Sequence, residues 1–319
     1  MVQGKYSFWI KLLYCLLAAL AITSYLVPFV DKEEDWIPLL SGYADLTAFN
    51  GNLLLRGILG GISNVLIALS LLVINTKSVN NVFNPNLSVA FFLILILLDP
   101  GASYLNSMHP ALLCFVWGQY FFISNRKFIS MFLLATSALF YAPLALALPL
   151  VWIISIIGAS DMLRVAVKSL GGLLLPFLYL LSFRYMAFGD AVIFLEEYSL
   201  HALGFSSPLH ILNVPTIFLI LCLAAITLHS VSYMFARLYS NSIITEHVLK
   251  MEFMCLILGS GLFFLFMGSG SVPVNMIVAL PIAMLFSHYF TGNITAAPAR
   301  VELILLCCAA VISRLYYFI

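Results

Sequence analysis

Long apolar segments separated by short polar loops run along the whole of this chain. A helix needs about 20 apolar residues to cross roughly 30 Å of hydrocarbon, and eleven segments reach or approach that length. They lie at 8–29, 53–74, 87–99, 109–124, 128–142, 143–159, 170–188, 214–237, 251–268, 274–291 and 302–318. The third and the fifth are short, so we expect them to be re-entrant, strongly tilted or buried among their neighbours. The pattern predicts an all-α, polytopic transmembrane helical bundle of about nine to eleven spans.

The composition points to the same class of protein. Apolar residues make up 63% of the chain and charged residues only 8%, whereas about a quarter of the residues of a soluble domain are charged. No segment is long and polar enough to form a soluble domain, so we expect a single integral membrane domain over 1–319. Chemistry is then confined to the bilayer or its surface loops, and we expect no cofactor and no nucleic-acid partner.

Three segments between the spans have the mixed polarity of interfacial segments: 31–52, 160–169 and 189–213. In the first, Trp36 is placed to sit at the level of the lipid headgroups. The second can be capped by Ser160 or Asp161 and is expected to lie on the cytoplasmic surface. The third is expected to lie on the outer surface as a helix broken at Gly204 and Pro208.

The basic residues predict the orientation, because they concentrate on the cytoplasmic side of membrane proteins. A cytoplasmic N-terminus places most of them inside: Lys5, Lys11, Lys77, Arg126, Lys127, Arg164, Lys168, Arg237, Lys250 and Arg300. The first apolar run carries no small-residue cleavage site, so we interpret it as the first span and not as a signal peptide. The six cysteines lie within apolar runs without metal-binding spacing, and we expect no metal site.

An acidic cluster follows the first predicted span. Asp31, Glu33, Glu34 and Asp35, called here the first-loop acids, would lie on the outer side. A carboxylate at this place can serve as a general base on an acceptor hydroxyl, so these are the catalytic candidates if the protein is an enzyme. The alternative is a solvated loop, because consecutive charged residues are typical of a surface in contact with water.

A second set of polar residues is expected on the same side. Asp99 ends one predicted span and His109 begins the next, and Arg184, Glu196 and Glu197 also fall on the outer side. Together they could form a ligand-binding pocket in which Arg184 contacts a phosphate. The alternative is that these residues cap helices and reach from helix ends toward the headgroups.

An ionisable residue deep within a span is the default functional marker of a membrane protein. His229 is the deepest in the predicted spans. It can donate a hydrogen bond to a neighbouring helix or take part in a proton relay, but the sequence places no carboxylate or lysine in the middle of a span to complete a relay. The pattern therefore argues against an ion-coupled pump.

Parts of the chain resemble a known family. The stretches NPNLSVAFFLILILLDPGASYLNSMHPALLCFVWGQYFF, SMFLLATSALFYAPLALALPLVWI and LRVAVKSLGGLLLPFLYLLSFRYM, and the later MGSGSVPVNMIVALPIAMLFSHYF, are similar to uncharacterised polytopic inner-membrane proteins of Bacteroidota. That resemblance implies a bacterial inner membrane. The same middle region is more loosely similar to the membrane core of polyprenyl-dependent glycosyltransferases, which implies a catalytic acid in the first outer loop.

These observations favour a non-catalytic integral subunit or accessory factor of a cell-envelope assembly or protein-export complex. Its expected partners are membrane lipids and other integral membrane proteins in a hetero-oligomer. A glycosyltransferase-like enzyme that uses a polyprenyl-linked donor is the second hypothesis. A lipid or small-molecule transporter is the third.

Overall fold

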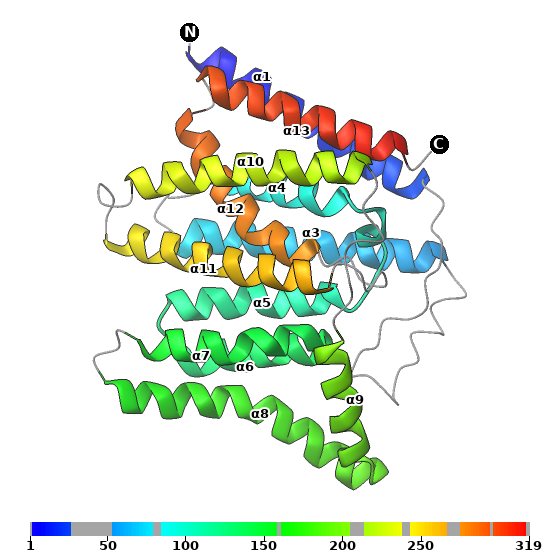
Figure 1. Cartoon of the computed structure of the whole chain (residues 1–319), viewed down its shortest axis with the longest axis vertical. Coiled ribbons are helices and arrows are strands. Elements are labelled where there is room, and N and C mark those ends of the chain that lie inside the picture. The colour runs from blue at the N-terminus through cyan, green and yellow to red at the C-terminus, as the bar shows by residue number, and fades with distance from the viewer. Residues whose placement is uncertain are drawn as a thin grey trace.

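The chain folds into a bundle of helices (Figure 1). The computed structural model describes residues 2–26, 53–78, 84–157, 161–204, 214–237, 243–266, 275–293 and 296–316, and within these ranges the regular structure is entirely helical. The first-loop acids and Trp36 lie outside the described residues. The all-α bundle predicted from the sequence is confirmed.

The helices, in chain order, are α1 (Val2–Leu26), α3 (Leu53–Ser78), α4 (Pro85–Leu97), η1 (Pro100–Ser103), α5 (Met108–Ile123), α6 (Lys127–Phe140), η2 (Ala142–Ala147), α7 (Leu148–Ile156), α8 (Met162–Phe188), α9 (Ala191–Leu203), α10 (Val214–Arg237), α11 (Ile243–Phe266), α12 (Asn275–Asn293) and α13 (Ala297–Tyr316). Each of the eleven predicted segments overlaps a helix. Five described stretches, within α3, α8, α10, α11 and α12, are long and apolar enough to cross a membrane, and further apolar helices are shorter.

Most helices run side by side, and their ends gather at two opposite sides of the molecule (Figure 1). Helices α1 and α13 form one edge of the bundle and α8 forms the other. Helix α9 crosses the helix ends and packs on η2 and α8. It covers the first part of the 189–213 segment and ends at Gly204, one of the two predicted breaks. The other, Pro208, lies outside the described residues.

Helix α4 lies at the centre of the bundle against α12. It has only 13 residues, which span about 20 Å at 1.5 Å per residue. Asn84 caps its first turn and accepts a hydrogen bond at its carbonyl from Ser287 Oγ (3.0 Å). Phe91, fully buried, stacks on Phe290 of α12 with ring centroids 5.2 Å apart. A short apolar helix is tolerated here because neighbouring helices surround it.

The turn between α4 and α5 is seated in the side of α3. A Cβ atom on Gly60 would stand 2.4 Å from the Ser103 carbonyl oxygen, so only glycine permits this approach. Asn64 Nδ2 donates to the Ala102 carbonyl (2.9 Å), and Arg56 Nε donates to the Leu105 carbonyl (2.9 Å). The backbone of the turn therefore packs directly against the α3 backbone at Gly60.

Helix α8 begins earlier than expected. Residues 162–169 form its first turns, continuous with the 170–188 segment, so they do not make a separate helix. Asp161 caps the helix, as the sequence indicated, by accepting from the Arg164 amide (3.4 Å). The helix ends at Gly189, whose φ of 70° is a conformation that suits glycine at a C-terminus.

Arg314 is a buried cation near the end of α13, with 4% of its surface exposed. Its Nη2 donates to Ser24 Oγ of α1 (2.5 Å) and to the Leu97 carbonyl at the end of α4. The orphan carbonyl groups of a helix end need donors where water is scarce. This arginine therefore joins three helices at one side of the bundle.

Candidate functional site

The predicted residues Asp99 and His109 lie in the same turn, between α4 and α5. Asp99 Oδ1 accepts from the Gly101 amide (2.9 Å) and caps η1. The His109 ring is 1% exposed, and its Nδ1 lies 3.1 Å from Asn106 Oδ1. Both side chains hydrogen-bond within the turn itself, and η1 in this turn packs against α1, α3 and α4.

Arg184 lies at the corner between α8 and α9. Its Nη2 is 2.6 Å from Asp190 Oδ2, and its guanidinium packs over the rings of Phe188 and Phe194 at 5.2 and 5.1 Å. The ion pair closes the corner between the two helices. Glu196 and Glu197, further along α9, are exposed. The structure thus places Asp99 and His109 in one turn and Arg184 at the start of α9, and different helices support these two places.

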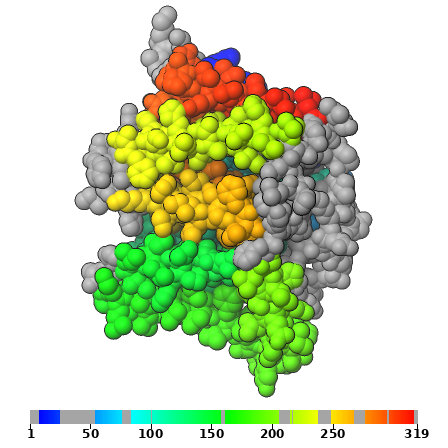
Figure 2. Space-filling model, viewed as in Figure 1, coloured from blue at the N-terminus to red at the C-terminus, as the bar shows by residue number. Residues whose placement is uncertain are grey.

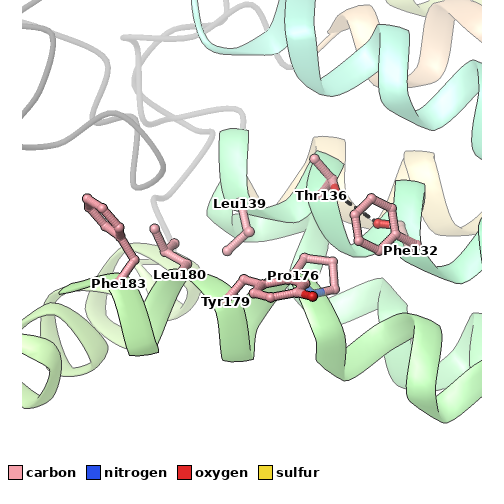
Figure 3. Close-up of a pocket in the computed structure, with 7 residues that line it drawn as sticks. All are labelled: Phe132, Thr136, Leu139, Pro176, Tyr179, Leu180 and Phe183. Carbon is pink, nitrogen blue, oxygen red and sulfur yellow. Dashed lines mark hydrogen bonds between the residues drawn. The ribbon is translucent and has the colours of Figure 1, made fainter. Parts of the chain in front are cut away.

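An apolar groove of about 400 Å³ lies between α6 and α8 (Figure 3). Its lining is Phe132, Thr136, Leu139, Pro176, Tyr179, Leu180 and Phe183. The Thr136 hydroxyl already donates to the Phe132 carbonyl (2.8 Å). With no charged side chain in its lining, the groove suits a hydrocarbon chain, and its lining includes no carboxylate, histidine or lysine.

A polar cluster that the sequence did not reveal lies where α10, α12 and α13 meet. His229 Nδ1 is 2.5 Å from Glu302 Oε1, although the two residues are 73 positions apart. The Tyr289 hydroxyl is 3.3 Å from the same imidazole nitrogen, and the two rings lie 5.0 Å apart. Tyr233, one turn after His229, packs edge-on against Tyr289 at 5.5 Å. Three helices therefore contribute to one hydrogen-bonded group.

The cluster lies within the length of the bundle. His229 is eight residues before Arg237 at the end of α10, or about 12 Å along the axis. Glu302 is five residues, or about 8 Å, into α13. The sequence placed no carboxylate in the middle of a span, and Glu302 stands at the start of the predicted span 302–318, but the packing of α13 on α10 brings it to His229. The prediction that His229 bonds a neighbouring helix is confirmed by the contact with Glu302.

The pairing orients the imidazole. Because Glu302 occupies Nδ1, the second ring nitrogen, Nε2, is the one available to another group. The His229 side chain is 46% exposed and that of Glu302 18%. The cluster therefore presents an oriented imidazole at the surface formed by α10 and α13.

A second carboxylate is buried in α11. Glu252 is 2% exposed and lies within the apolar stretch Val248–Phe266. Cys255 follows one turn later, and its sulfur accepts from Gln119 Nε2 of α5 (2.9 Å). The sequence prediction started this span at 251 and so left Glu252 at its border. Including the apolar pair Val248 and Leu249 would have placed the carboxylate inside it.

No protein-family model, no curated protein and no solved structure matches this chain.

Proposed function

We propose that this chain is a non-catalytic integral subunit or accessory factor of a hetero-oligomeric membrane complex in the bacterial cell envelope. Its place is the inner membrane, with a cytoplasmic N-terminus as the basic residues predict. The observation that carries the proposal is the oriented, partly exposed imidazole of His229, paired with Glu302 at membrane depth. The five helices long and apolar enough to cross a membrane support the membrane location.

The docking surface of this proposal is the α10–α13 face. We define it by exposed side chains of both helices: Leu221, Ala225, Leu228, His229 and Ser232 of α10, and Val301, Ile304, Leu305 and Cys308 of α13. The two helices pack side by side, and both are visible on one face of the molecule (Figure 2). Apolar side chains alone would suit lipid as well as protein, so the polar residue on this face is the informative one.

Hydrocarbon cannot hydrogen-bond to an imidazole nitrogen, and burying a polar group without a partner costs about 1–3 kcal/mol. A serine, threonine, asparagine or glutamine on a partner helix would remove that cost. Interhelical hydrogen bonds in membranes are worth about 0.6 kcal/mol on average and up to about 2. The small side chains of Ala225 and Ser232 on the same face allow a second helix to approach closely. Packing of the apolar side chains then contributes most of the affinity for the partner helix, and the hydrogen bond of His229 determines how that helix is aligned.

Site-specific photo-crosslinking in native membranes tests the proposal. A photoreactive amino acid at Leu228, which is 70% exposed, should give a discrete adduct with another membrane protein. The same amino acid at Val65, 54% exposed on α3, is the control and should give none. The adduct from Leu228 should weaken in H229L and disappear in A225W, because tryptophan fills the space that the partner helix needs.

Other outcomes contradict the proposal in distinct ways. An adduct with a second copy of this chain would replace the hetero-oligomer with a homo-oligomer. Equal labelling at Leu228 and Val65, or an adduct indifferent to H229L and A225W, would remove the α10–α13 face as a docking surface. A monodisperse monomer from native membranes in several mild detergents would contradict the subunit role itself.

A further inference from the structure

Glu252 occupies an unusual place for a carboxylate. It lies nine residues after Ile243, or about 14 Å along α11, and only 2% of its surface is exposed. The flanking α11 residues Val248, Leu249 and Leu256 are also buried. The carboxyl group is therefore held inside the bundle and within an apolar span.

Among the described residues, Glu252 Oε2 has no hydrogen-bond partner. The polar groups that the structure connects to Glu252 are neutral: the thiol of Cys255, which interacts electrostatically with Glu252, and the amide of Gln119 that donates to that sulfur. No described basic side chain forms a salt bridge with it within 4.0 Å. The site therefore offers polarity without a compensating positive charge.

The elements packed against α11 add no such charge. Helix η2 consists of Ala, Pro and Leu residues. On α12, the ring of His288 packs on Tyr233 of α10 (5.8 Å), and Tyr289 faces the His229 cluster. Lys127 of α6 donates to the Phe122 carbonyl (3.2 Å), and Lys250 on α11 itself is exposed.

Desolvating a lone carboxylate costs several kcal/mol even after the protein relaxes. A neutral carboxylic acid avoids most of that cost, and its proton can be shared with a neighbouring acceptor. We propose that Glu252 is a reversible proton-binding site inside the membrane, lined by Gln119 and Cys255. In the step, a hydronium ion transfers a proton to a carboxylate oxygen, which gives the neutral acid and water, and the reverse step returns the proton to water as hydronium. This site is independent of the docking surface proposed above.

Dicyclohexylcarbodiimide tests the site, because this apolar reagent reacts with protonated carboxyl groups in membranes. The acid proton moves to a carbodiimide nitrogen while a carboxyl oxygen bonds to the central carbon, and rearrangement leaves a stable acylurea with no other product. We expect peptide mass spectrometry of the native-membrane protein to map one adduct to Glu252. The adduct should fall as pH rises, by about tenfold per pH unit once the carboxylate predominates.

Two variants test whether the reactive group is the carboxyl of Glu252 or the thiol of Cys255. E252Q should lose the adduct, whereas C255A should keep it. An adduct that persists in E252Q or vanishes in C255A would make Cys255 the reactive group and overturn the proposal. No adduct at Glu252 at any pH from about 6 to 9, or one indifferent to pH, would also overturn reversible proton binding. Mapping the adduct in the unmodified protein decides the question even if E252Q fails to fold.

Discussion

Replacing Gly60 with alanine measures how tightly the turn between α4 and α5 is seated on α3. The new Cβ would stand 2.4 Å from the Ser103 carbonyl oxygen and 2.7 Å from the Leu105 amide nitrogen. Both contacts are to backbone atoms, which cannot rotate away as the tip of a side chain can. The substitution therefore has to push the turn off the helix.

The expected cost follows from three contributions. Overpacking costs about 1–3 kcal/mol, and alanine returns about 1 kcal/mol in helix propensity. Moving the turn also strains three hydrogen bonds to it: those donated by Arg56 Nε and Asn64 Nδ2, and the one that the Arg56 carbonyl accepts from the Leu105 amide. At the membrane average of roughly 0.6 kcal/mol each, the three are together worth about 2 kcal/mol. We expect a net destabilisation of about 2–4 kcal/mol.

The matched control is Gly261→Ala in α11. A Cβ at Gly261 would meet no atom within 4 Å, so this variant should be neutral or gain up to about 1 kcal/mol. Thermal unfolding in a mild detergent reports both, followed with a thiol-reactive fluorophore on the partly buried cysteines Cys114, Cys222 and Cys255. Each kcal/mol shifts Tm by about 2–4 °C, so G60A should lose at least about 4 °C. If G60A and G261A unfold at the same temperature, the turn is not held by this contact.

Three further predictions concern the outer side and the orientation. D190N leaves the buried Arg184 without its ion-pair partner, so it should destabilise the protein by about 1–3 kcal/mol. The control E196Q, at an exposed position, should change the stability by no more than about 0.5 kcal/mol. Equal Tm values for the two variants would show that the ion pair does not hold α8 and α9 together. Cysteines introduced at Lys127 and Lys168 should be shielded from an impermeant thiol reagent in intact spheroplasts and one at Glu34 labelled, and the reverse pattern would invert the topology. If the protein is a glycosyltransferase, replacing the true base among the first-loop acids by its amide should lower the rate by about 10²–10⁴-fold, whereas full activity in the four single variants and in the combined variant would exclude this loop as the active site.

The positions of the helices were predictable because each depends mainly on local composition. Each predicted apolar run overlaps a helix, and the predicted boundary between the runs 128–142 and 143–159 falls close to the break between α6 and η2. Asp161 was recognisable as a cap because its side chain serves the amide three residues later. These features need only neighbouring residues, so a single sequence suffices to predict them.

The polar contacts were harder to predict because they join residues far apart in the chain. His229 meets Glu302, which is 73 positions away in the chain. Gly60 lies against the backbone of Ser103 and Leu105, more than 40 residues further along the chain. Periodicity shows which face of a helix is apolar, but it does not show which element will cover that face.

The sequence by itself determined the class of the protein, since a chain this apolar and this poor in charge must place most of its residues away from water. Only the tertiary structure decided which polar side chains would meet. It paired His229 with Glu302 across two helices, and it buried Glu252 without a salt-bridge partner among the described residues. The physical reason is that desolvation and partnering depend on three-dimensional neighbours, and the packing of α10, α12 and α13 sets those neighbours.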